Sequence, residues 1–317
     1  MDRRNFLLAA PTVLIGSSLP LRLAADGHAA APAILPGVIR RTVGDMSVTA
    51  LSDGFLTIGH EVLQGIEKDD FDAMVSAAYG DPGNNLAAVN AYYIETGELK
   101  ILVDIGTGTA FGPTLGQLPA NLAAAGIDTS AVTHLLVTHL HPDHVGGLVG
   151  ETSVALPNAE MVVGTQDHSF FTSEEMKAQA PDGFKPFFDM AVAAAGQFGE
   201  RVTLIDGEAS IAPGITAMPL PGHTPGHMGF MLESGGEQLL IWGDILHVPA
   251  VQFARPDVTL AFDADPDTAR ASRTKVLDMV ATDKLMVAGM HMSFPGLGYV
   301  ERASEGYRLV PAPWDYT

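Results

Sequence analysis

The sequence predicts a layered α/β fold, built as one domain from about residue 35 to residue 317. Two observations lead to this prediction. Strand-length apolar segments and helical segments follow one another in mixed order along the chain, which is typical of layered α/β architectures. Four of the apolar segments also run into a histidine or an aspartate, and sheets covered by helices place their sites at the carboxyl ends of strands.

A β-rich section opens the predicted domain. Residues 47–51 alternate at the period of a strand, and residues 53–54 predict a turn after it. The apolar segments 91–94 and 100–103 flank a Thr-Gly pair at 96–97, which predicts a β-hairpin.

Helical patterns appear in two places. Leu115, Leu118 and Leu122 fall on one face of a predicted helix. A longer helix is expected from about Asp265, a suitable N-cap that is followed by proline, through Val276, Met279 and Val280. These helices would cover the sheets.

Each of the later apolar segments leads into a candidate metal ligand. The junctions are 135–138 with His139, 215–220 with His223, 238–242 with Asp244, and 285–288 with His291. The sequence therefore places the candidate ligands together at strand ends.

Composition excludes several classes of site. Lys and Arg total 17 and Asp and Glu total 37, so the formal charge is −20. This charge argues against nucleic-acid binding and against docking on an anionic membrane. The chain has no cysteine, which excludes disulfides, thiol nucleophiles, iron–sulfur clusters and thiolate zinc sites. Any metal must be held by His, Asp and Glu.

The first residues resemble a twin-arginine export signal. Arg3 and Arg4 precede an apolar stretch, 6–21, that is followed by small residues. We expect residues 1–29 to be removed and residues 30–317 to form the mature domain, which would be periplasmic or secreted. The apolar stretch contains two prolines and is shorter than the roughly 20 residues that span a bilayer, so no stable membrane anchor is expected.

The densest chemical signal runs from His139 to His144. In an extended segment, His139 and His141 project to the same side. Pro142 can start a helix that brings Asp143 and His144 back over the same space. Imidazoles and carboxylates at this density suit more than one divalent ion, most often zinc, with manganese, iron and cobalt as alternatives.

The ligand blocks resemble the metallo-β-lactamase superfamily of αββα hydrolases. His-x-His-x-Asp-His, Gly-His, Gly-Asp and a final His stand at 139–144, 222–223, 243–244 and 291, in that family's order. The resemblance implies a four-layer αββα sandwich in a single domain. It is closer to the methyl parathion hydrolase branch, through the stretches 111–116, 141–148, 222–227, 251–253 and 293–296.

The resemblance also implies two metal ions and their ligands. The first ion would be held by His139, His141 and His223, the second by Asp143, His144 and His291, and Asp244 would bridge the two. Asp104, in a matching strand-end motif, is expected to be a structural carboxylate or one that supports a ligand.

Two divalent ions predict hydrolysis without a side-chain nucleophile. The ions lower the pKa of a water between them, supply a bridging hydroxide, and polarise a carbonyl or phosphoryl oxygen. Asp143 and Asp244 are the expected catalytic carboxylates. His247 follows Asp244 by three residues and is expected to face the pocket as a further catalytic group.

Aromatic residues are expected to form an apolar substrate pocket. The candidates are Phe111, Phe170, Phe171, Phe187, Phe188, Phe253 and Phe262. Family members that hydrolyse organophosphate triesters have a Leu-type residue in place of His247 and a smaller one in place of Phe262. A polar His247 and a bulky Phe262 favour a flat lactone or aryl ester over a tetrahedral phosphotriester.

Other functions remain open. The chain is also compatible with an efficient phosphotriesterase of the methyl parathion hydrolase type, with a thioester hydrolase, sulfur oxygenase or β-lactamase of the same fold, and with a non-catalytic periplasmic metal-binding protein. The expected partner is a small apolar or aromatic ester, lactone or phosphotriester. A homodimer is compatible with the sequence. His227 either orients His223 or simply packs.

Overall fold

The structure is a computed structural model that describes residues 37–150 and 152–315. The predicted export signal, residues 1–29, lies outside these residues. The described residues belong to one compact unit. Among them, no helix combines the length and the apolar character needed to cross a membrane.

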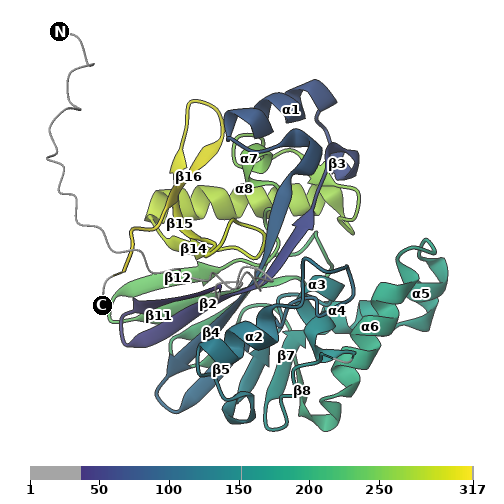
Figure 1. Ribbon diagram of the computed structural model, residues 1–317, viewed down its shortest axis with the longest axis vertical. Helices are drawn as coiled ribbons and strands as arrows, with labels where there is room; N and C mark the ends of the chain where they lie inside the picture. Colours follow the sequence, from purple (N-terminus) through teal and green to yellow (C-terminus); the bar gives the residue numbers. More distant parts are fainter. Residues whose placement is uncertain (1–36, 151, 316–317) are drawn as a thin grey trace, which may run out of the picture. The chain divides into compact units, whose positions relative to one another are not determined.

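Two seven-stranded sheets form the centre of the molecule (Figure 1). The first sheet is mixed, with antiparallel pairs from β1 to β5 and parallel pairs from β5 to β8. In spatial order it contains β1 (Val38–Val43), β2 (Met46–Thr57), β4 (Leu86–Thr96), β5 (Leu99–Val103), β6 (His134–Leu136), β7 (Glu160–Gly164) and β8 (Val202–Ile205).

The second sheet is antiparallel except for the parallel pair β12–β14. Its spatial order is β16 (Tyr307–Pro311), β15 (Leu297–Arg302), β14 (Met286–Ala288), β12 (Glu237–Ile241), β11 (Met228–Ser234), β10 (Ile215–Pro219) and β9 (Ala209–Ala212). A separate ribbon pairs β13 (Thr259–Leu260) with β3 (Leu63–Gln64).

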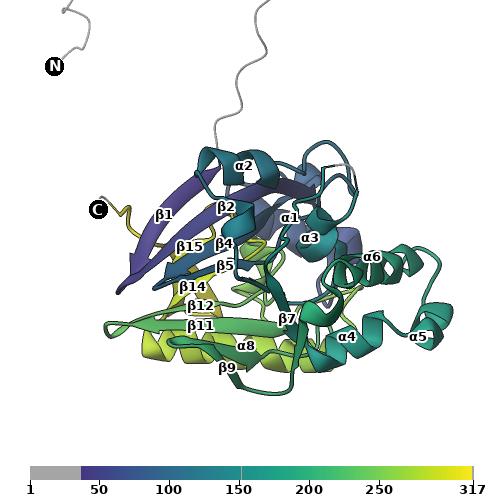
Figure 2. The ribbon, with the colours of Figure 1, turned by 90° about the horizontal axis from the view of Figure 1, so that it is seen from below.

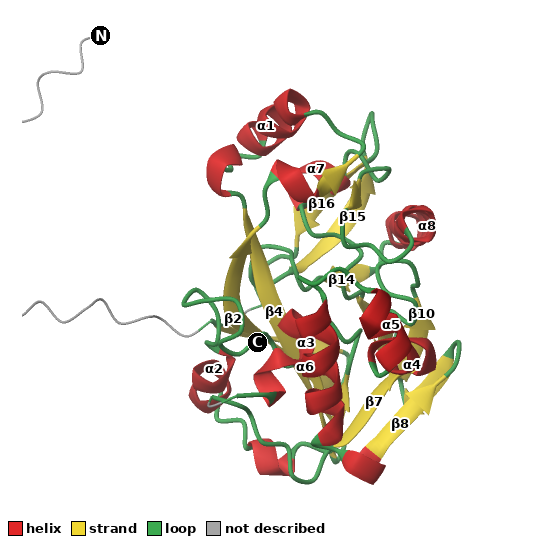
Figure 3. Ribbon diagram, turned by 90° about the vertical axis from the view of Figure 1, so that its right-hand side faces the viewer, coloured by secondary structure: helices red, strands yellow, loops and turns green. Residues whose placement is uncertain are grey.

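Helices cover the outer face of each sheet. Figure 2 shows α2 on the far side of the first sheet from the second, and α8 below the second sheet. Figure 3 shows α3, α4, α5 and α6 close together. The helices are α1 (Lys68–Ala77), α2 (Leu118–Ala124), α3 (Pro142–Val145), α4 (Thr165–Phe171), α5 (Glu174–Gln179), α6 (Lys185–Gly196), α7 (Pro249–Gln252) and α8 (Pro266–Asp283).

The buried side chains explain the layers. Strand side chains alternate between faces: in β12, Leu239 and Ile241 join the core between the sheets, whereas Leu240 packs under α8. In β5, Ile101 enters the core between the sheets and Leu102 packs toward α2 and α6. The predicted αββα layering is therefore confirmed.

Several predicted elements are also confirmed. Residues 47–51 lie in β2, and 91–94 and 100–103 lie in the antiparallel pair β4–β5. Asp265 caps α8, because its side chain accepts a hydrogen bond from the Thr268 amide. Of the expected leucine face, Leu115 precedes α2, which begins at Leu118.

The turn predicted at 53–54 is wrong. Strand β2 continues to Thr57, with a register shift between Ser52 and Gly54. A β-bulge, rather than a turn, accommodates the glycine. The Asp53 carboxylate is buried and accepts hydrogen bonds from the Thr107 and Leu118 amides. The Asp53-Gly54 pair, typical of turns, thus lies inside a strand, and Asp53 contacts residues far away in the sequence.

Candidate metal centre

Local chain geometry turns the His139–His144 segment back on itself. Strand β6 ends at Leu136, and His141 is extended at the N-cap of α3. Pro142 stands at the first position of that helix, where a missing amide proton costs nothing. The helix carries Asp143 and His144 back toward His139, as the sequence predicts.

The first group of candidate ligands contains three imidazoles. His139, His141 and His223 have ligand atoms within 4.8 Å of one another. The Nδ1 atom of His141 lies 3.0 Å from the Nε2 atom of His139 and 3.0 Å from the Nε2 atom of His223. All three side chains are buried. We call them the imidazole group.

The second group contains carboxylates. Asp143, His144, Asp244 and His291 have ligand atoms within 4.8 Å of one another. The Nε2 atom of His291 lies 3.3 Å from the Asp143 carboxylate and 3.1 Å from the Asp244 carboxylate. We call Asp143, His144 and His291 the carboxylate group.

Asp244 lies between the two groups. Its Oδ2 atom is 3.2 Å from the Nε2 atom of His144 in the carboxylate group. The same oxygen is 3.6 Å from the Nε2 atom of His139 and 3.4 Å from the Nε2 atom of His223 in the imidazole group. One carboxylate oxygen therefore faces both groups.

Outer partners orient the imidazole rings. The Nδ1 atom of His144 is 2.7 Å from the Asp104 carboxylate, and that of His223 is 2.9 Å from the Asp263 carboxylate. The Nδ1 atom of His291 is 2.7 Å from the Ala88 carbonyl oxygen. An Nδ1 proton donated to these acceptors leaves the Nε2 lone pair directed into the centre.

These donor atoms fit divalent cations. The Nε2 atom of His144 and the Oδ1 atom of Asp244 are buried and have no hydrogen-bond partner among the described residues, and an unpaired buried polar atom is costly. In the imidazole group, the Nδ1 atom of His141 lies at hydrogen-bond distance from the Nε2 atoms of His139 and His223, and ring nitrogens without a proton offer lone pairs there. Cations between the lone pairs would satisfy all of these atoms.

Burial and charge shift the pKa values of the ligands. Burial, together with the neighbouring imidazoles, lowers the pKa of His139 and of His141 well below the usual value. In the carboxylate group, the Asp244 and Asp143 charges overcome the effect of burial and raise the pKa of His291 to about 10. The surrounding imidazoles, His144 foremost, hold the pKa of Asp244 well below its usual range despite burial.

His247 lies beside the two groups, and its ring forms a third set of possible ligand atoms with His223 and Asp244. Its Nε2 atom is 3.0 Å from the Asp244 carboxylate, and its Nδ1 atom is buried and has no partner in residues 37–150 and 152–315. Its ring stacks on His291 with centroids 4.7 Å apart and meets Phe262 edge-on at 5.3 Å. Burial lowers the pKa of His247 to about 4, so the ring is neutral at neutral pH.

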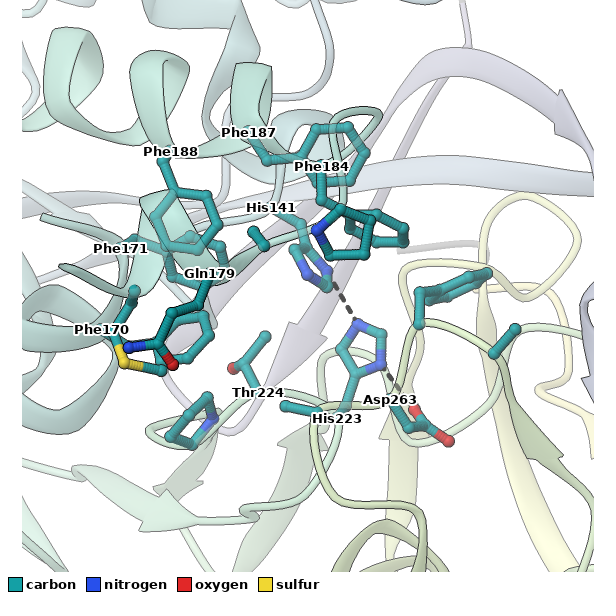
Figure 4. A pocket seen from close by; sticks show the side chains of 17 residues that line it. His141, Phe170, Phe171, Gln179, Phe184, Phe187, Phe188, His223, Thr224 and Asp263 are labelled. Atoms are coloured by element: carbon teal, nitrogen blue, oxygen red, sulfur yellow. Dashed lines mark hydrogen bonds and ion pairs between the residues drawn. The ribbon is translucent and has the colours of Figure 1, made fainter. Parts of the chain in front are cut away.

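Two apolar cavities adjoin the ligands. One, of about 280 Å³, is lined by His141 and His223 and by a cluster of aromatic rings (Figure 4). The other, of about 220 Å³, is lined by Asp143, Asp244, His247 and His291. His141, Phe184, Phe187 and Phe262 line both cavities.

The structure places most of the expected pocket residues on these walls. Phe170, Phe171 and Phe188 line the larger cavity, and Phe111 lines the smaller one. Phe253 does not: it is buried against Trp242 in the core between α8 and the second sheet. That expectation is wrong because Phe253 follows α7 and points inward.

The sequence does not indicate two carboxylates that support the ligands. Asp263 is paired with His223, and the buried Asp167 accepts hydrogen bonds from backbone amides of two ligand-bearing segments. His227 contacts the Asp244 amide and the Leu220 carbonyl through its two nitrogens, rather than orienting His223 through a hydrogen bond. No spacing pattern in the sequence marks these contacts, because each joins distant segments.

A family model described as the metallo-beta-lactamase superfamily matches residues 85–291. Among curated proteins, the lactamase-like protein adaB of Aspergillus niger is 30% identical over 168 residues, which cover 52% of this chain and 41% of that protein. An atrochrysone carboxyl ACP thioesterase of Aspergillus fumigatus is 25% identical over 213 residues, which cover 67% of this chain and 38% of that protein. The chain thus spans about two fifths of the length of these relatives.

Solved structures share the fold over nearly their whole length. The hydrolase AbOPH of the beta-lactamase superfamily has a TM-score of 0.83 at 28% identity, covering 89% of this chain and 100% of that chain. AidC, a dizinc quorum-quenching lactonase, has a TM-score of 0.82 at 23% identity, covering 89% of this chain and 99% of that chain. At 23% identity, the likeness to AidC shows a shared fold and nothing more.

The family model covers more than half of the chain and every candidate ligand from His139 to His291. The layered fold and the convergence of His and Asp side chains at its strand ends agree with that match. This chain belongs to the metallo-β-lactamase superfamily.

Proposed function

We propose that the protein is a two-metal hydrolase that cleaves small apolar or aromatic esters and lactones. The observation that carries this proposal is the position of the cavities: apolar, phenylalanine-lined space opens directly on two converging groups of metal ligands. Such a site binds an apolar substrate and presents its polar bond to the ligand side.

The residues divide into three roles. The imidazole group would hold one divalent ion, the carboxylate group would hold the other, and Asp244 would contact both. Zinc suits this donor set best. When bound, the ions would supply a water of lowered pKa and polarise the carbonyl oxygen of the substrate.

His247 would contact the substrate. It lines the smaller cavity and is oriented by its contact with Asp244 and by stacking on His291. Because its ring is neutral, it adds no charge beside the metal ions; its one ring proton faces the Asp244 carboxylate, and its other nitrogen is an acceptor. Phe262 packs against it and lines both cavities. A flat ester or lactone fits this space better than a tetrahedral phosphotriester.

Two comparisons bear on the substrate class. AidC, which shares the fold, is a lactonase. One curated relative, matched over 38% of its own length, is an atrochrysone carboxyl ACP thioesterase. Both activities attack an acyl carbon, as the proposed ester hydrolysis does. Phosphotriester hydrolysis of the methyl parathion hydrolase type is the second candidate, supported by the sequence stretches shared with that branch.

The test compares two substrates on one protein. The zinc-loaded protein is assayed for catalytic efficiency on dihydrocoumarin and on methyl parathion in the same buffer. We expect a large preference for the lactone. Equal or greater efficiency on the phosphotriester would overturn the substrate assignment, and bound zinc without turnover of either substrate would favour a non-catalytic metal-binding protein. Metal-stripped protein is the control.

We also propose that the protein is exported through its twin-arginine-like signal and acts in the periplasm or outside the cell. The support is the Arg3-Arg4 pair ahead of the apolar stretch. Replacing both arginines by lysine is expected to retain the full-length chain in the cytoplasm. Unchanged export of this variant would refute the twin-arginine route.

A further inference from the structure

Asp167 is a buried carboxylate that the proposed reaction does not use. It lies in α4 and has no exposed surface. Its Oδ2 atom accepts a hydrogen bond of 2.9 Å from the Leu140 amide, and its Oδ1 atom accepts one of 2.7 Å from the Gly226 amide. Leu140 stands between His139 and His141, and Gly226 follows His223 by three residues. The carboxylate therefore joins two segments that carry ligands of the imidazole group.

The packing at this junction leaves no room for a side chain at Gly226 or Gly164. A side chain at Gly226 would place its Cβ atom 2.3 Å from the Asp167 nitrogen. A Cβ atom at Gly164 would lie 2.3 Å from the Gly226 carbonyl oxygen. The start of α4 and the loop after His223 are thus in direct backbone contact, and both glycines allow it.

The His141 ring packs against α4 and also against Phe187 of α6. Within the described part of the chain, its ring nitrogens have hydrogen-bond-distance neighbours only in His139 and His223. Phe171 packs edge-on against the His141 ring with centroids 5.5 Å apart. Asp167 and Phe171 are four residues apart on α4, which places them on one face. That face holds both the backbone before His141 and its ring.

We propose that Asp167 is a positioning residue for the metal ion of the imidazole group. By fixing two backbone segments to one carboxylate, it sets the separation of His139, His141 and His223 before a metal ion binds. Preorganised ligands need less reordering on binding, which raises metal affinity. The proposal rests on the proposed metal centre, and it concerns one of its two ions only.

The variant Asp167→Asn tests this role with little change of volume. An amide group keeps one acceptor oxygen, but its NH₂ group faces the other backbone amide as a second donor. We expect affinity at one of two metal-binding steps to fall about 10–100-fold, the usual effect of removing an outer partner. The other step is expected to be unchanged. Titration of the metal-stripped full chain with Zn²⁺, and with Co²⁺ followed by its absorption, measures both steps.

Asp53→Asn is the matched control. Asp53 is equally buried and also accepts two backbone amides, from Thr107 and Leu118, but neither belongs to a ligand-bearing segment. The Asp53→Asn variant is expected to have a lower free energy of unfolding. It is not expected to weaken the metal-binding step that Asp167→Asn weakens. Equal effects of the two variants on both steps, or two wild-type steps in Asp167→Asn, would overturn the proposal. Wild-type protein that binds fewer than two ions would instead overturn the metal centre itself.

Amide hydrogen exchange on the wild-type protein covers the case in which Asp167→Asn does not fold. In metal-stripped protein, the Leu140 and Gly226 amides are expected to be protected as well as the Thr107 and Leu118 amides that Asp53 holds. Fast exchange at Leu140 and Gly226, with slowing only after zinc is added, would show that the metal rather than Asp167 organises these segments.

Discussion

The two ligand groups of the centre differ in charge. The imidazole group contains no carboxylate, and burial lowers the pKa of His139 and of His141. The carboxylate group includes Asp143, whose negative charge offsets part of the charge of a dication. Asp244 faces both groups, so its charge is shared. The difference predicts that two ions in adjacent sites are held with unequal strength, more tightly in the carboxylate group.

Removal of the shared ligand, Asp244, is expected to have the largest effect on metal binding. Asp244→Ala is expected to weaken both metal-binding steps and to abolish turnover, because both ions lose a charged ligand. The expected loss exceeds the roughly 100-fold that removal of an outer partner costs. Metal content and turnover are measured together, with Asp143→Ala as the control that weakens only one ion. An Asp244→Ala protein with full metal content and rate would refute the shared role.

The second test removes one ligand from each group. We expect His223→Ala to retain one ion with the affinity of the tighter wild-type step, whereas His291→Ala loses that step. The reason is that the carboxylate group keeps its own negative charge without His223. Competition with a chelator of known affinity measures both variants. The reverse order of affinities would contradict the charge argument.

The third test changes the outer partners. Asp104→Asn removes a charged acceptor from His144, and Asp263→Asn does the same for His223. Each variant is expected to lower the affinity of its own group about 10–100-fold. Asp263→Asn is expected to leave the other group unchanged, whereas Asp104→Asn has a smaller effect on the imidazole group too, because Asp104 also accepts the Thr138 amide beside His139. The two metal-binding steps are read by cobalt absorption. Identical losses in both steps for both variants would mean that these contacts act on folding in general.

The smallest expected change is in specificity. His247→Leu is expected to bind both ions and to shift the ratio of efficiencies toward methyl parathion and away from dihydrocoumarin, because the cavity loses a hydrogen-bonding group and becomes apolar. Both efficiencies are measured with zinc-saturated protein. An unchanged ratio of efficiencies would show that His247 does not determine specificity. The variant His247→Asn, which keeps a polar side chain, separates the loss of polarity from the change of shape.

The sequence predicts the convergence of the candidate ligands, because the segments that carry them follow apolar strands. The segment from His139 to His144 needs only an extended pair and a proline-initiated turn to gather its side chains. The layering can also be predicted from the sequence, since alternate side chains of strands such as β12 enter two different cores. These features depend on local pattern.

The supporting residues depend on long-range contacts. Asp167 reaches amides 27 and 59 residues away, and Asp263 reaches His223 across 40 residues. Asp53 shows the same limit, since a pair typical of turns serves instead as an anchor for the distant amides of Thr107 and Leu118. Phe253, expected in the pocket, is buried against Trp242 for a similar reason. Tertiary packing decided each case.

The most direct test of the two-metal centre is the anomalous scattering of zinc-loaded crystals at the zinc absorption edge. We predict two peaks, one among His139, His141 and His223 and the other among Asp143, His144 and His291, with the Asp244 carboxylate between them. A single peak, or two peaks that Asp244 does not separate, would contradict the shared centre.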